Sequence, residues 1–407
     1  MNSSGSPRKS RWLNATVLGI GLASLLSDCS HEIATSLLPA FLATMGASAA
    51  WLGVIEGISD GLSSLAKLGS GYYTDQLRRR KPIAILGYLV TTAGVATIGL
   101  ATQAWHVLLC RGTAWLGRGL RTPVRKTLLA AAVTPETYGR AFGFERMMDT
   151  LGAIVGPTAA TALLVALKDN YTQLFMLTLI PGLAATVAIA VLVREKERLP
   201  VSHVSFVGRL ATLPKRFRRF LVGVGLFGAG DFAHTMLILL AIEKLSPTLG
   251  KLTAAAVAVS LYVLHNVLYA AFAFLAGVLA DRSDKHRLLA IGYGLAALMA
   301  VAIIFFPMNF PVLVIVFVLA GIYVAAEEAL EDSLAAELVD KDSHGMGFGV
   351  LATVNGLGDF ISSLVVGLLW ASFGTGIAFG YSAILFALGA LSIWRLRWTP
   401  TAGKAYG

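Results

Sequence analysis

The chain has 407 residues, of which 56% are hydrophobic and 14% are charged, and its formal net charge is +10. Soluble globular domains carry about 25% charged residues, so this composition excludes that class and indicates an integral membrane protein. The positive charge does not indicate a nucleic-acid partner, because the basic residues lie in short loops between apolar runs. Both cysteines, Cys29 and Cys110, fall within apolar segments, which argues against a structural disulfide.

Twelve apolar segments follow one another along the chain. A helix that crosses a bilayer needs about 20 apolar residues, and segments of this length meet that requirement. The only long polar linker lies between the sixth and seventh segments. We therefore predict an all-α membrane protein in which residues 1–193 and 219–407 form two six-helix bundles and residues 194–218 form a cytoplasmic linker. The predicted segments are 13–43, 51–75, 82–102, 106–132, 139–166, 172–193, 219–243, 252–280, 287–307, 310–338, 346–371 and 375–396.

Lysine and arginine residues gather in the loops on one side of the predicted helices. Arg8, Lys9 and Arg11 precede the first segment, and similar basic runs follow the second, sixth, eighth and twelfth segments. Cytoplasmic loops carry the excess of Lys and Arg, so this asymmetry predicts a multi-pass protein of the cell (inner) membrane with both termini in the cytoplasm. The first apolar run is too long for a cleavable signal peptide and lacks a small-residue cleavage site.

The first segment carries Asp28, His31 and Glu32 near its middle, and the seventh repeats the Asp-x-x-His spacing at Asp231 and His234, 203 residues later. An ionisable side chain at the centre of a membrane helix costs about 2.5–3.5 kcal/mol, so these groups should face a polar interior. Buried carboxyl and imidazole groups can exchange protons near neutral pH. We predict that the two clusters meet at an aqueous chamber, bind substrate and couple its movement to protons. A hydrogen-bonded cluster that only holds helices together is the alternative.

The second segment adds a charged stripe of Glu56, Asp60 and Lys67. Because their spacing of four and seven residues places them on one helix face, either carboxylate can face the cluster of the first segment. Asp60 is therefore a further candidate for substrate binding and proton coupling. The eighth segment offers His265 and Asn266, and a satisfied polar network between helices is the alternative for all of these residues.

The loop after the second segment contains a motif from Gly71 to Arg80, and a similar motif, Gly277 to His286, begins 206 residues later. The pair resembles the signature of the major facilitator superfamily, Gly-x-x-x-Asp-Arg-x-Gly-Arg-Arg/Lys, with Gln76 in place of its first Arg. The resemblance covers all twelve segments. It implies two parallel bundles related by a pseudo-two-fold repeat, with a substrate site between them near the bilayer midplane.

The same resemblance implies that the acidic residue of each motif and its basic neighbours form a cytoplasmic gate. A carboxylate at a helix end can bind an arginine or a helix N-terminus, and that contact must break when the site opens inward. A basic loop that only sets topology is the alternative. The predicted gating residues are Asp75, Arg79, Arg80, Asp281 and Arg282.

Charged residues also recur in the fourth, fifth and tenth segments. The arginines of the fourth segment share a helix face and can either pair with acids of the fifth segment or bind an anionic group. The acids of the tenth segment can form an interhelical latch or line a solvated mouth. The predicted charge network of the cavity comprises Arg118, Arg121, Glu145, Asp149, Glu327 and Glu331.

The fifth segment resembles the antiporter branches of the same superfamily. Gly143, Gly152, Gly156 and Pro157 fit the pattern Gly-x8-Gly-x3-Gly-Pro, although Ala160 replaces the closing glycine. Small residues at such spacing let one helix approach another closely, which is also what a generic packing helix would need. The resemblance favours export in exchange for protons.

These observations predict a proton-coupled exporter of a small solute that works by alternating access. The alternatives are an exporter of divalent transition-metal cations, which Asp28, His31, Asp231 and His234 would ligate, an organic-anion transporter, and a carrier of apolar or cationic organic compounds. A receptor without transport is disfavoured, because no soluble domain is present to receive a signal. We expect no catalysis, no cofactor beyond the proton as coupling ion, and no partner beyond the bilayer and the substrate. One chain contains a complete pathway, so we expect a monomer.

Overall fold

The computed structural model describes residues 12–47, 49–167, 170–195 and 205–396, and within these ranges the chain is helical without any strand. The helices of the first half are α1 (Ala15–Thr44), α2 (Ala49–Gln76), α3 (Lys81–Thr97), α4 (Ala104–Ala132), α5 (Tyr138–Ala166), α6 (Tyr171–Leu177) and α7 (Leu179–Leu192). The linker contains α8 (Phe206–Thr212). The helices of the second half are α9 (Lys215–Gly228), α10 (Thr235–Leu249), α11 (Lys251–Ala280), α12 (Lys285–Phe305), α13 (Phe310–Leu338), α14 (His344–Phe373) and α15 (Thr375–Trp394).

Each predicted apolar segment falls on one helix or on two consecutive helices. Among the described residues, eight helical runs are long and apolar enough to cross a membrane. The prediction of an all-α membrane protein built from two helical bundles is thereby confirmed. The basic residues Arg8, Lys9 and Arg11, on which the predicted orientation partly rests, lie outside the described residues.

The seventh segment differs from its prediction in two ways. Helix α9 begins at Lys215 rather than at 219, which shortens the predicted linker. The segment is also broken, because the chain leaves the helix after Gly228 and re-enters it at Thr235. Gly228 is the last residue of α9 and Gly230 lies within the break, and a glycine costs a helix about 1 kcal/mol relative to alanine. The break places Asp231 on non-helical backbone in the middle of the bundle.

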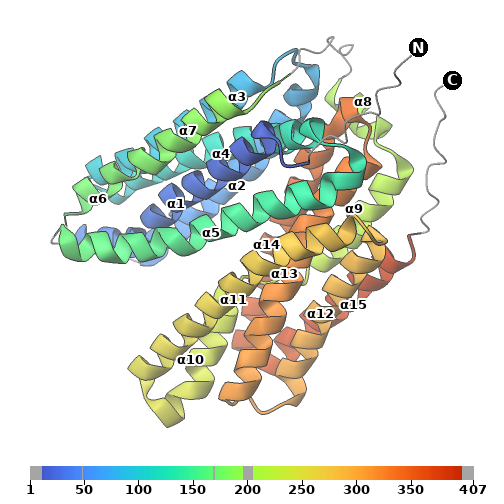
Figure 1. Ribbon diagram of the computed structural model, residues 1–407. Helices are drawn as coiled ribbons and strands as arrows, with labels where there is room; N and C mark the ends of the chain where they lie inside the picture. Colours follow the sequence, from blue (N-terminus) through green and yellow to red (C-terminus); the bar gives the residue numbers. More distant parts are fainter. Residues whose placement is uncertain (1–11, 48, 168–169, 196–204, 397–407) are drawn as a thin grey trace, which may run out of the picture.

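The two halves meet at one end of the molecule and diverge at the other, where α6 and α10 lie (Figure 1). We call the closed end the basic end, because the Lys- and Arg-rich loops 78–81 and 282–287 lie there, next to the ends of α2 and α11. The halves are joined by two pairs of helices, α2 with α14 and α5 with α11. This arrangement leaves space for a cavity between the halves above the basic end.

Glycines allow the paired helices to touch at the basic end. A Cβ atom on Gly345 of α14 would lie 2.5 Å from the carbonyl oxygen of Gly71 in α2, and one on Gly143 of α5 would lie 2.5 Å from the carbonyl oxygen of Ala273 in α11. Gly139 and Gly277 make the matching backbone contact between α5 and α11. Gly71 and Gly345 are each 206 residues from a member of that second pair, so the contacts repeat under the internal duplication.

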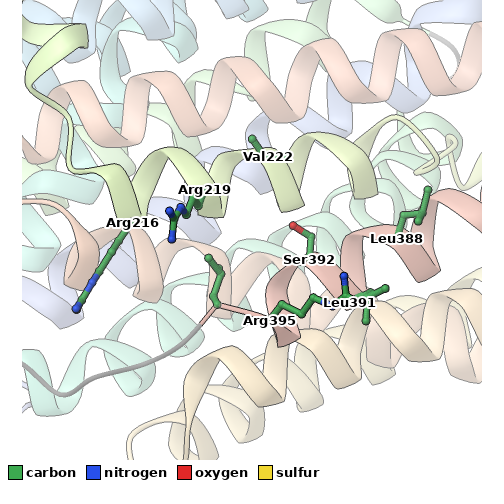
Figure 2. A pocket seen from close by; sticks show the side chains of 8 residues that line it. Arg216, Arg219, Val222, Leu388, Leu391, Ser392 and Arg395 are labelled. Atoms are coloured by element: carbon green, nitrogen blue, oxygen red, sulfur yellow. The ribbon is translucent and has the colours of Figure 1, made fainter.

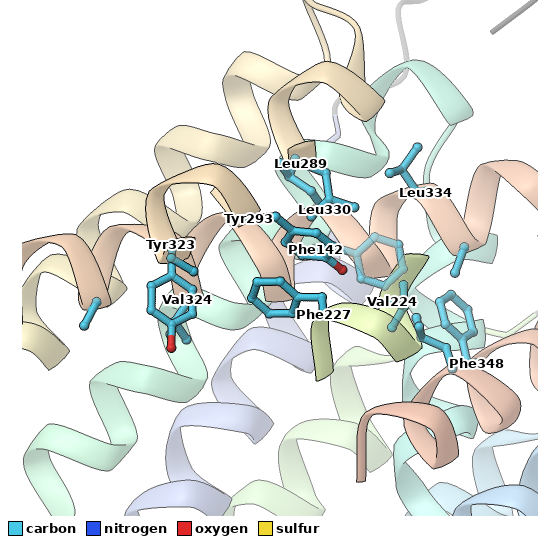
Figure 3. Close-up of a cluster of buried hydrophobic side chains, with 14 of the residues drawn as sticks. Phe142, Val224, Phe227, Leu289, Tyr293, Tyr323, Val324, Leu330, Leu334 and Phe348 are labelled. Carbon is cyan, nitrogen blue, oxygen red and sulfur yellow. The ribbon is translucent and has the colours of Figure 1, made fainter. Parts of the chain in front are cut away.

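The apolar core of the second half is rich in aromatic rings. Phe227 of α9 stacks on Tyr293 of α12 with ring centroids 3.7 Å apart, and Figure 3 shows both rings within the buried cluster. The same core extends across to the first half, because Phe142 of α5 lies against Phe348 of α14 with centroids 5.6 Å apart. Apolar packing therefore ties the two bundles together at the basic end.

Candidate functional site

Two aspartates close the basic end by binding the N-termini of helices in the opposite half. The carboxylate of Asp75 accepts hydrogen bonds from the backbone N–H groups of Gly345 and Met346, each at 2.8 Å. The carboxylate of Asp281 accepts from the N–H groups of Gly139 at 2.8 Å and Arg140 at 3.1 Å. A negative charge at a helix N-terminus is favourable because the free N–H groups and the helix dipole point at it. We call these two contacts the latches.

The latch at Asp281 carries a further charge contact. The guanidinium Nε of Arg140 lies 2.9 Å from the Asp281 carboxylate. Burial raises the pKa of the Asp281 carboxyl group, and the N–H donors of Arg140 and Gly139 oppose that shift. The geometry thus matches the predicted contact between a motif aspartate and a helix N-terminus, in both halves.

The basic residues predicted for the gate are placed differently from the aspartates. The side chain of Arg80 is buried and donates to the carbonyl oxygen of Thr74 at 3.1 Å, while its backbone N–H donates to the Glu195 carboxylate at 2.8 Å. Arg79 and Arg282 are exposed to solvent. Arg80 therefore stabilises the end of α2 and the start of α3 rather than bridging the halves.

Three further contacts join residues that occupy equivalent positions in the two halves, 206 residues apart. The ammonium group of Lys126 lies 2.6 Å from the carboxylate of Asp332, and both side chains are buried. Phe142 packs against Phe348, and the ring of Tyr138 lies 6.4 Å from that of His344. A residue that contacts its own counterpart must lie close to the pseudo-two-fold axis. These pairs define the axis and fill it with buried side chains.

Helix α5 gives the order of the contacts along the axis. Tyr138, Phe142 and Arg146 follow one another at intervals of one helical turn from the basic end. The guanidinium of Arg146 reaches across the interface to Glu328 at 2.5 Å and to Asp332 at 3.7 Å. Two aromatic layers and then a layer of ion pairs thus separate the basic end from the space beyond.

Beyond the ion pairs lies a cavity of about 560 Å³ between the two halves. The first half supplies five basic side chains and two acidic ones to its wall, whereas the second half supplies four acidic side chains and no Lys or Arg. We call the two sides the basic wall and the acidic wall. The charged residues of the basic wall are Asp60, Lys67, Arg118, Arg125, Lys126, Arg146 and Asp149, and those of the acidic wall are Asp231, Glu327, Glu328 and Asp359.

The predicted cluster of the first segment does not itself line this cavity. Asp28 and His31 are buried, and they lie against two residues that do line it. The Asp28 carboxylate is 3.5 Å from the guanidinium of Arg118, and the ring centroid of His31 is 4.3 Å from that of Trp115. Glu32 is half-buried and lies 3.6 Å from the His31 ring. These groups therefore support the basic wall from behind.

Close packing of α1 on α5 explains this position. A Cβ atom on Gly152 would lie 3.0 Å from the Cβ of Asp28, and one on Gly156 would lie 2.7 Å from the Cβ of Glu32. The two glycines of the antiporter-like pattern thus let α1 and α5 approach closely, as predicted. That approach places the Cβ atoms of Asp28 and Glu32 against α5.

The predicted residues of the seventh segment do line the cavity, at the break between α9 and α10. Tyr323 of α13 donates a hydrogen bond to the Asp231 carboxylate at 3.0 Å, and the His234 ring lies 4.8 Å from that of His265. The unwound backbone is satisfied from neighbouring helices: Ser362 donates to the carbonyl oxygen of Asp231 at 2.6 Å. Non-helical backbone at membrane depth is tolerated only where the protein supplies such partners.

The structure does not bring the two predicted clusters together. Asp28 and His31 belong to the first half and are covered by Arg118 and Trp115, whereas Asp231 and His234 face the cavity from the second half. Among the described residues there is no group of three or more His, Cys, Asp or Glu side chains able to share a metal ion. The four ligands of the predicted metal site are therefore split into two pairs in this structure.

The predicted stripe of the second segment divides in a similar way. Asp60 lines the cavity and accepts a hydrogen bond from the indole N–H of Trp115 at 2.7 Å, whereas Glu56 lies 2.9 Å from the guanidinium of Arg111. Lys67 lines the cavity and makes no hydrogen bond or ion pair with any described residue. Asp60 and Lys67 are thus available to a solute, and Glu56 belongs to a polar network between helices.

The predicted charge network separates into structural and cavity-facing members. Arg125 pairs with Glu145 at 2.7 Å and with Asp149 at 3.6 Å, as expected for the fourth and fifth segments. Arg121 instead lies over the ring of Tyr88 at 4.1 Å and does not reach the cavity.

In α13, the two predicted acids also have different roles. Glu331 accepts hydrogen bonds from Tyr293 and, at 2.7 Å, from Asn355, so it is satisfied within the second half. Glu327 is buried at the cavity wall and makes no hydrogen bond or ion pair with the rest of the described chain. The contacts across the interface come from their neighbours Glu328 and Asp332.

The sequence contained a signal for the axis pairs that our prediction did not use. The offset of 206 residues that aligns the motifs also aligns Lys126 with Asp332 and Phe142 with Phe348. Complementary residues at equivalent positions are what a contact across a two-fold axis requires. The break before α10 was also signalled, by the two glycines that precede Asp231.

Comparisons with known proteins complete the description. A sequence model of the Major Facilitator Superfamily matches residues 20–240 and 220–406. The chain is 27% identical over 381 residues to a protein of Methanocaldococcus jannaschii named uncharacterized MFS-type transporter MJ1317, with 94% of each chain covered. It is 32% identical over 117 residues to the multidrug resistance protein MdtH of Salmonella paratyphi B, which covers 28% of this chain and 29% of that one. The fucose:proton symporter FucP of E. coli superposes with a TM-score of 0.75 at 15% identity, over 94% of this chain and 98% of that chain, which shows a shared fold.

Proposed function

This chain belongs to the Major Facilitator Superfamily of transporters, and on that premise we propose that it exports a small charged solute in exchange for protons by alternating access. The observation that carries the proposal is the cavity between the basic and acidic walls, which is closed toward the basic end by the latches and the axis pairs. A site between two halves that can rock against each other is the arrangement that alternating access needs.

The basic end is the cytoplasmic end in this proposal, because an excess of Lys and Arg marks cytoplasmic loops. The structure then corresponds to an outward-facing state. Opening toward the cytoplasm requires that Asp75 release the N-terminus of α14, that Asp281 release that of α5, and that Lys126 separate from Asp332. The substrate and the coupling ion must bind the two states differently to drive this change.

Proton coupling is supported by the carboxylates of the acidic wall. Glu327 has no partner among the described residues, and Asp231 accepts only a neutral Tyr323 hydroxyl. An unpaired carboxylate within a membrane protein is costly, so a proton or a cationic group must neutralise it before the halves close around it. If the proton and the substrate compete for these carboxylates, each proton that enters the cell displaces a substrate molecule that leaves it.

The charges of the two walls favour a substrate that carries both signs. Lys67 and Arg118 present positive charge to an anionic group, and Asp231, Glu327 and Asp359 present negative charge to a cationic group. A small zwitterion would be neutralised at both ends, whereas a simple ion would satisfy one wall only. An organic anion is the second candidate, favoured by Lys67, which has no partner in the described part of the chain.

The test uses purified protein in proteoliposomes with an imposed pH gradient and a pH-sensitive dye inside. We expect amino acids or dipeptides to cause proton movement, while monocarboxylates and primary amines of similar size cause less. Glu327→Gln should abolish the proton movement, whereas the control Glu243→Gln, at an exposed carboxylate of α10, should not. Solute flux that ignores the pH gradient would contradict the proposal, and flux of monocarboxylates alone would favour the organic-anion candidate.

A further inference from the structure

The paired helices α2 and α14 continue from the closed basic end into the transport cavity. A Cβ atom on Gly349 of α14 would lie 3.0 Å from the carbonyl oxygen of Lys67, and one on Gly356 would lie 2.9 Å from the hydroxyl oxygen of Ser64. Together with the glycine contact at the basic end, these contacts form a series that runs along the two helices in opposite directions. We call this line of contact the α2–α14 interface.

Beyond the last of these contacts, each helix carries an aspartate. Asp60 is four residues from Ser64 and Asp359 is three residues from Gly356, so each lies on the helix face that makes the contacts. Both side chains are exposed and line the cavity. Within the described chain, Asp60 accepts a hydrogen bond from the indole N–H of Trp115 at 2.7 Å, and the Asp359 carboxylate has no hydrogen bond or ion pair.

The charges at this interface do not balance. Lys67 lies on the same face of α2 and also lines the cavity, and the charges of Lys67 and Asp60 both act on the Asp359 carboxylate. The Lys67 ammonium group can neutralise one of the two carboxylates, so one negative charge remains.

The neighbouring helices do not supply the missing positive charge. The titratable groups that they present to the cavity are Arg118, Arg125 and Lys126 of α4, Arg146 and Asp149 of α5, Tyr262 of α11, Glu327 and Glu328 of α13, and Asp231 and His234 at the break between α9 and α10. Each of the four Lys and Arg side chains among them already lies within 3.5 Å of an acidic partner. The carboxylates among them add to the negative charge.

The equivalent interface between α5 and α11 is neutral at the matching positions. The residue equivalent to Asp60 is Asn266, and the residue equivalent to Asp359 is Ala153, each at the offset of 206 residues. Closing that interface brings no carboxylates together at these positions. The charge cost of closing the outer side, where the halves diverge, therefore falls on α2 and α14.

A larger hollow elsewhere in the molecule lies outside both interfaces. It has a volume of about 810 Å³ and opens between α9 and α15, where Figure 2 shows Arg216 pointing away from Arg219 and Arg395. Both helices belong to the second half, so a movement of the two halves against each other does not open or close this hollow. The acids of the α2–α14 interface, in contrast, lie on both moving parts.

We propose that Asp60 and Asp359 meet when the outer side closes and hold one proton between them. This inference rests on the alternating access proposed above. Two carboxylates that share a site repel each other, and one proton relieves the repulsion by bonding to an oxygen of one group and forming a hydrogen bond to the other. A proton taken up from the outer side thus permits closure. The cationic group of the solute takes its place for the return.

The test measures the outer opening directly and needs no substrate. With Cys29 and Cys110 replaced by alanine, spin labels at Val54→Cys of α2 and Ser372→Cys of α14 report the distance between two exposed positions near the outer ends of these helices. Over about pH 9 to 5, we expect the fraction with the shorter distance to rise as the pH falls, because closure takes up a proton. Uptake of one proton changes the ratio of closed to open molecules by at most about tenfold per pH unit.

Two single variants remove the repulsion that the proton relieves. Asp60→Asn and Asp359→Asn should each close the outer side at every pH and reduce the response to less than about twofold per pH unit. The control Glu243→Gln, at an exposed carboxylate outside the cavity, should keep the response of the wild type. Because both aspartates are exposed, their replacement leaves no buried group without a partner.

Two results would overturn this inference. One is a wild-type distance distribution that does not change with pH, and the other is an unchanged pH response in both aspartate variants. Either would leave the exchange of solute for protons standing if the dye measurement shows it. A normal pH response of the distance without any solute-driven proton movement would instead contradict the proposed function alone.

Discussion

Helix α1 runs without interruption through Asp28, whereas its counterpart in the second half breaks into α9 and α10 around Asp231. The continuous helix packs its acidic group against α5 and behind Arg118, so the first half presents basic side chains to the cavity. The broken helix exposes Asp231 to the cavity directly. The same Asp-x-x-His spacing therefore serves a supporting role in one half and a wall-lining role in the other.

At the basic end the two halves have stayed alike. Both latches use an aspartate at the end of one helix and the first N–H groups of another, and the glycines beside them repeat at the same offset. The two halves close the basic end with equivalent contacts. The cavity walls instead differ in charge, and a solute with two different ends requires such a difference. The comparison thus separates the contacts that repeat in both halves from the cavity walls, whose charges differ between the halves.

The largest effect is expected at the pair on the axis. Asp332→Leu should lower the free energy of unfolding by about 3–5 kcal/mol, because it leaves the buried Lys126 charge without its partner. Lys126→Met should cost less, because the Arg146 guanidinium still lies 3.7 Å from the Asp332 carboxylate. The exchanged variant Lys126→Asp with Asp332→Lys should recover more than half of this loss, since both positions lie close to the pseudo-two-fold axis. Denaturant unfolding in detergent measures all three. An exchanged variant no more stable than the singles would contradict the equivalence of the two positions.

An intermediate effect is expected from filling the glycine contacts. A Cβ atom on Gly345 would lie 2.5 Å from the carbonyl oxygen of Gly71, and one on Gly139 would lie 2.7 Å from the Asp281 carboxylate. Gly345→Ala and Gly139→Ala should therefore disfavour the closed basic end by about 1–3 kcal/mol, to a similar degree in the two halves.

Spin labels measure this opening. With Cys29 and Cys110 replaced by alanine, labels at Arg78→Cys and Lys341→Cys report the distance between the halves at two exposed positions. The distance should lengthen in both glycine variants and stay unchanged in the control Gly294→Ala, where an added Cβ meets nothing within 4 Å. Lengthening in only one of the two variants would show that the halves do not close by equivalent contacts.

The smallest loss of stability is expected when the aspartate of either latch is neutralised. Asp75→Asn and Asp281→Asn each remove a negative charge from a helix N-terminus, which is worth about 0.3–1 kcal/mol at an exposed site and up to about 2 kcal/mol when partly buried. At Asp281 the loss also includes the ion pair with the Arg140 guanidinium, which lies 2.9 Å from the carboxylate. Thermal unfolding compares both with the exposed control Asp340→Asn. An Asp281→Asn variant that unfolds at the temperature of the wild type would contradict a stabilising role for this latch.

The sequence predicted the parts of the site that depend on position along the chain. The repeated motif located Asp75 and Asp281 at helix ends, and a helix end can reach the N-terminus of another helix wherever the interface closes. The glycines of α5 likewise predicted a close neighbour. Arg121 and Asp28 were predicted to face the cavity, but Arg121 lies over Tyr88 and Asp28 lies behind Arg118. Hydropathy does not indicate which neighbour a polar side chain contacts.

Hydropathy, charge and internal repetition by themselves determined the membrane class, the helical segments and the duplication. These properties follow from local sequence, because burial of apolar surface and backbone hydrogen bonding act on each segment. Only the tertiary structure decided that α1 stays whole while α9 and α10 separate, that Asp28 lies behind Arg118, and that Lys126 meets Asp332. The rotation of each helix about its own axis settles such contacts, and that rotation is set jointly by all the helices packed around it.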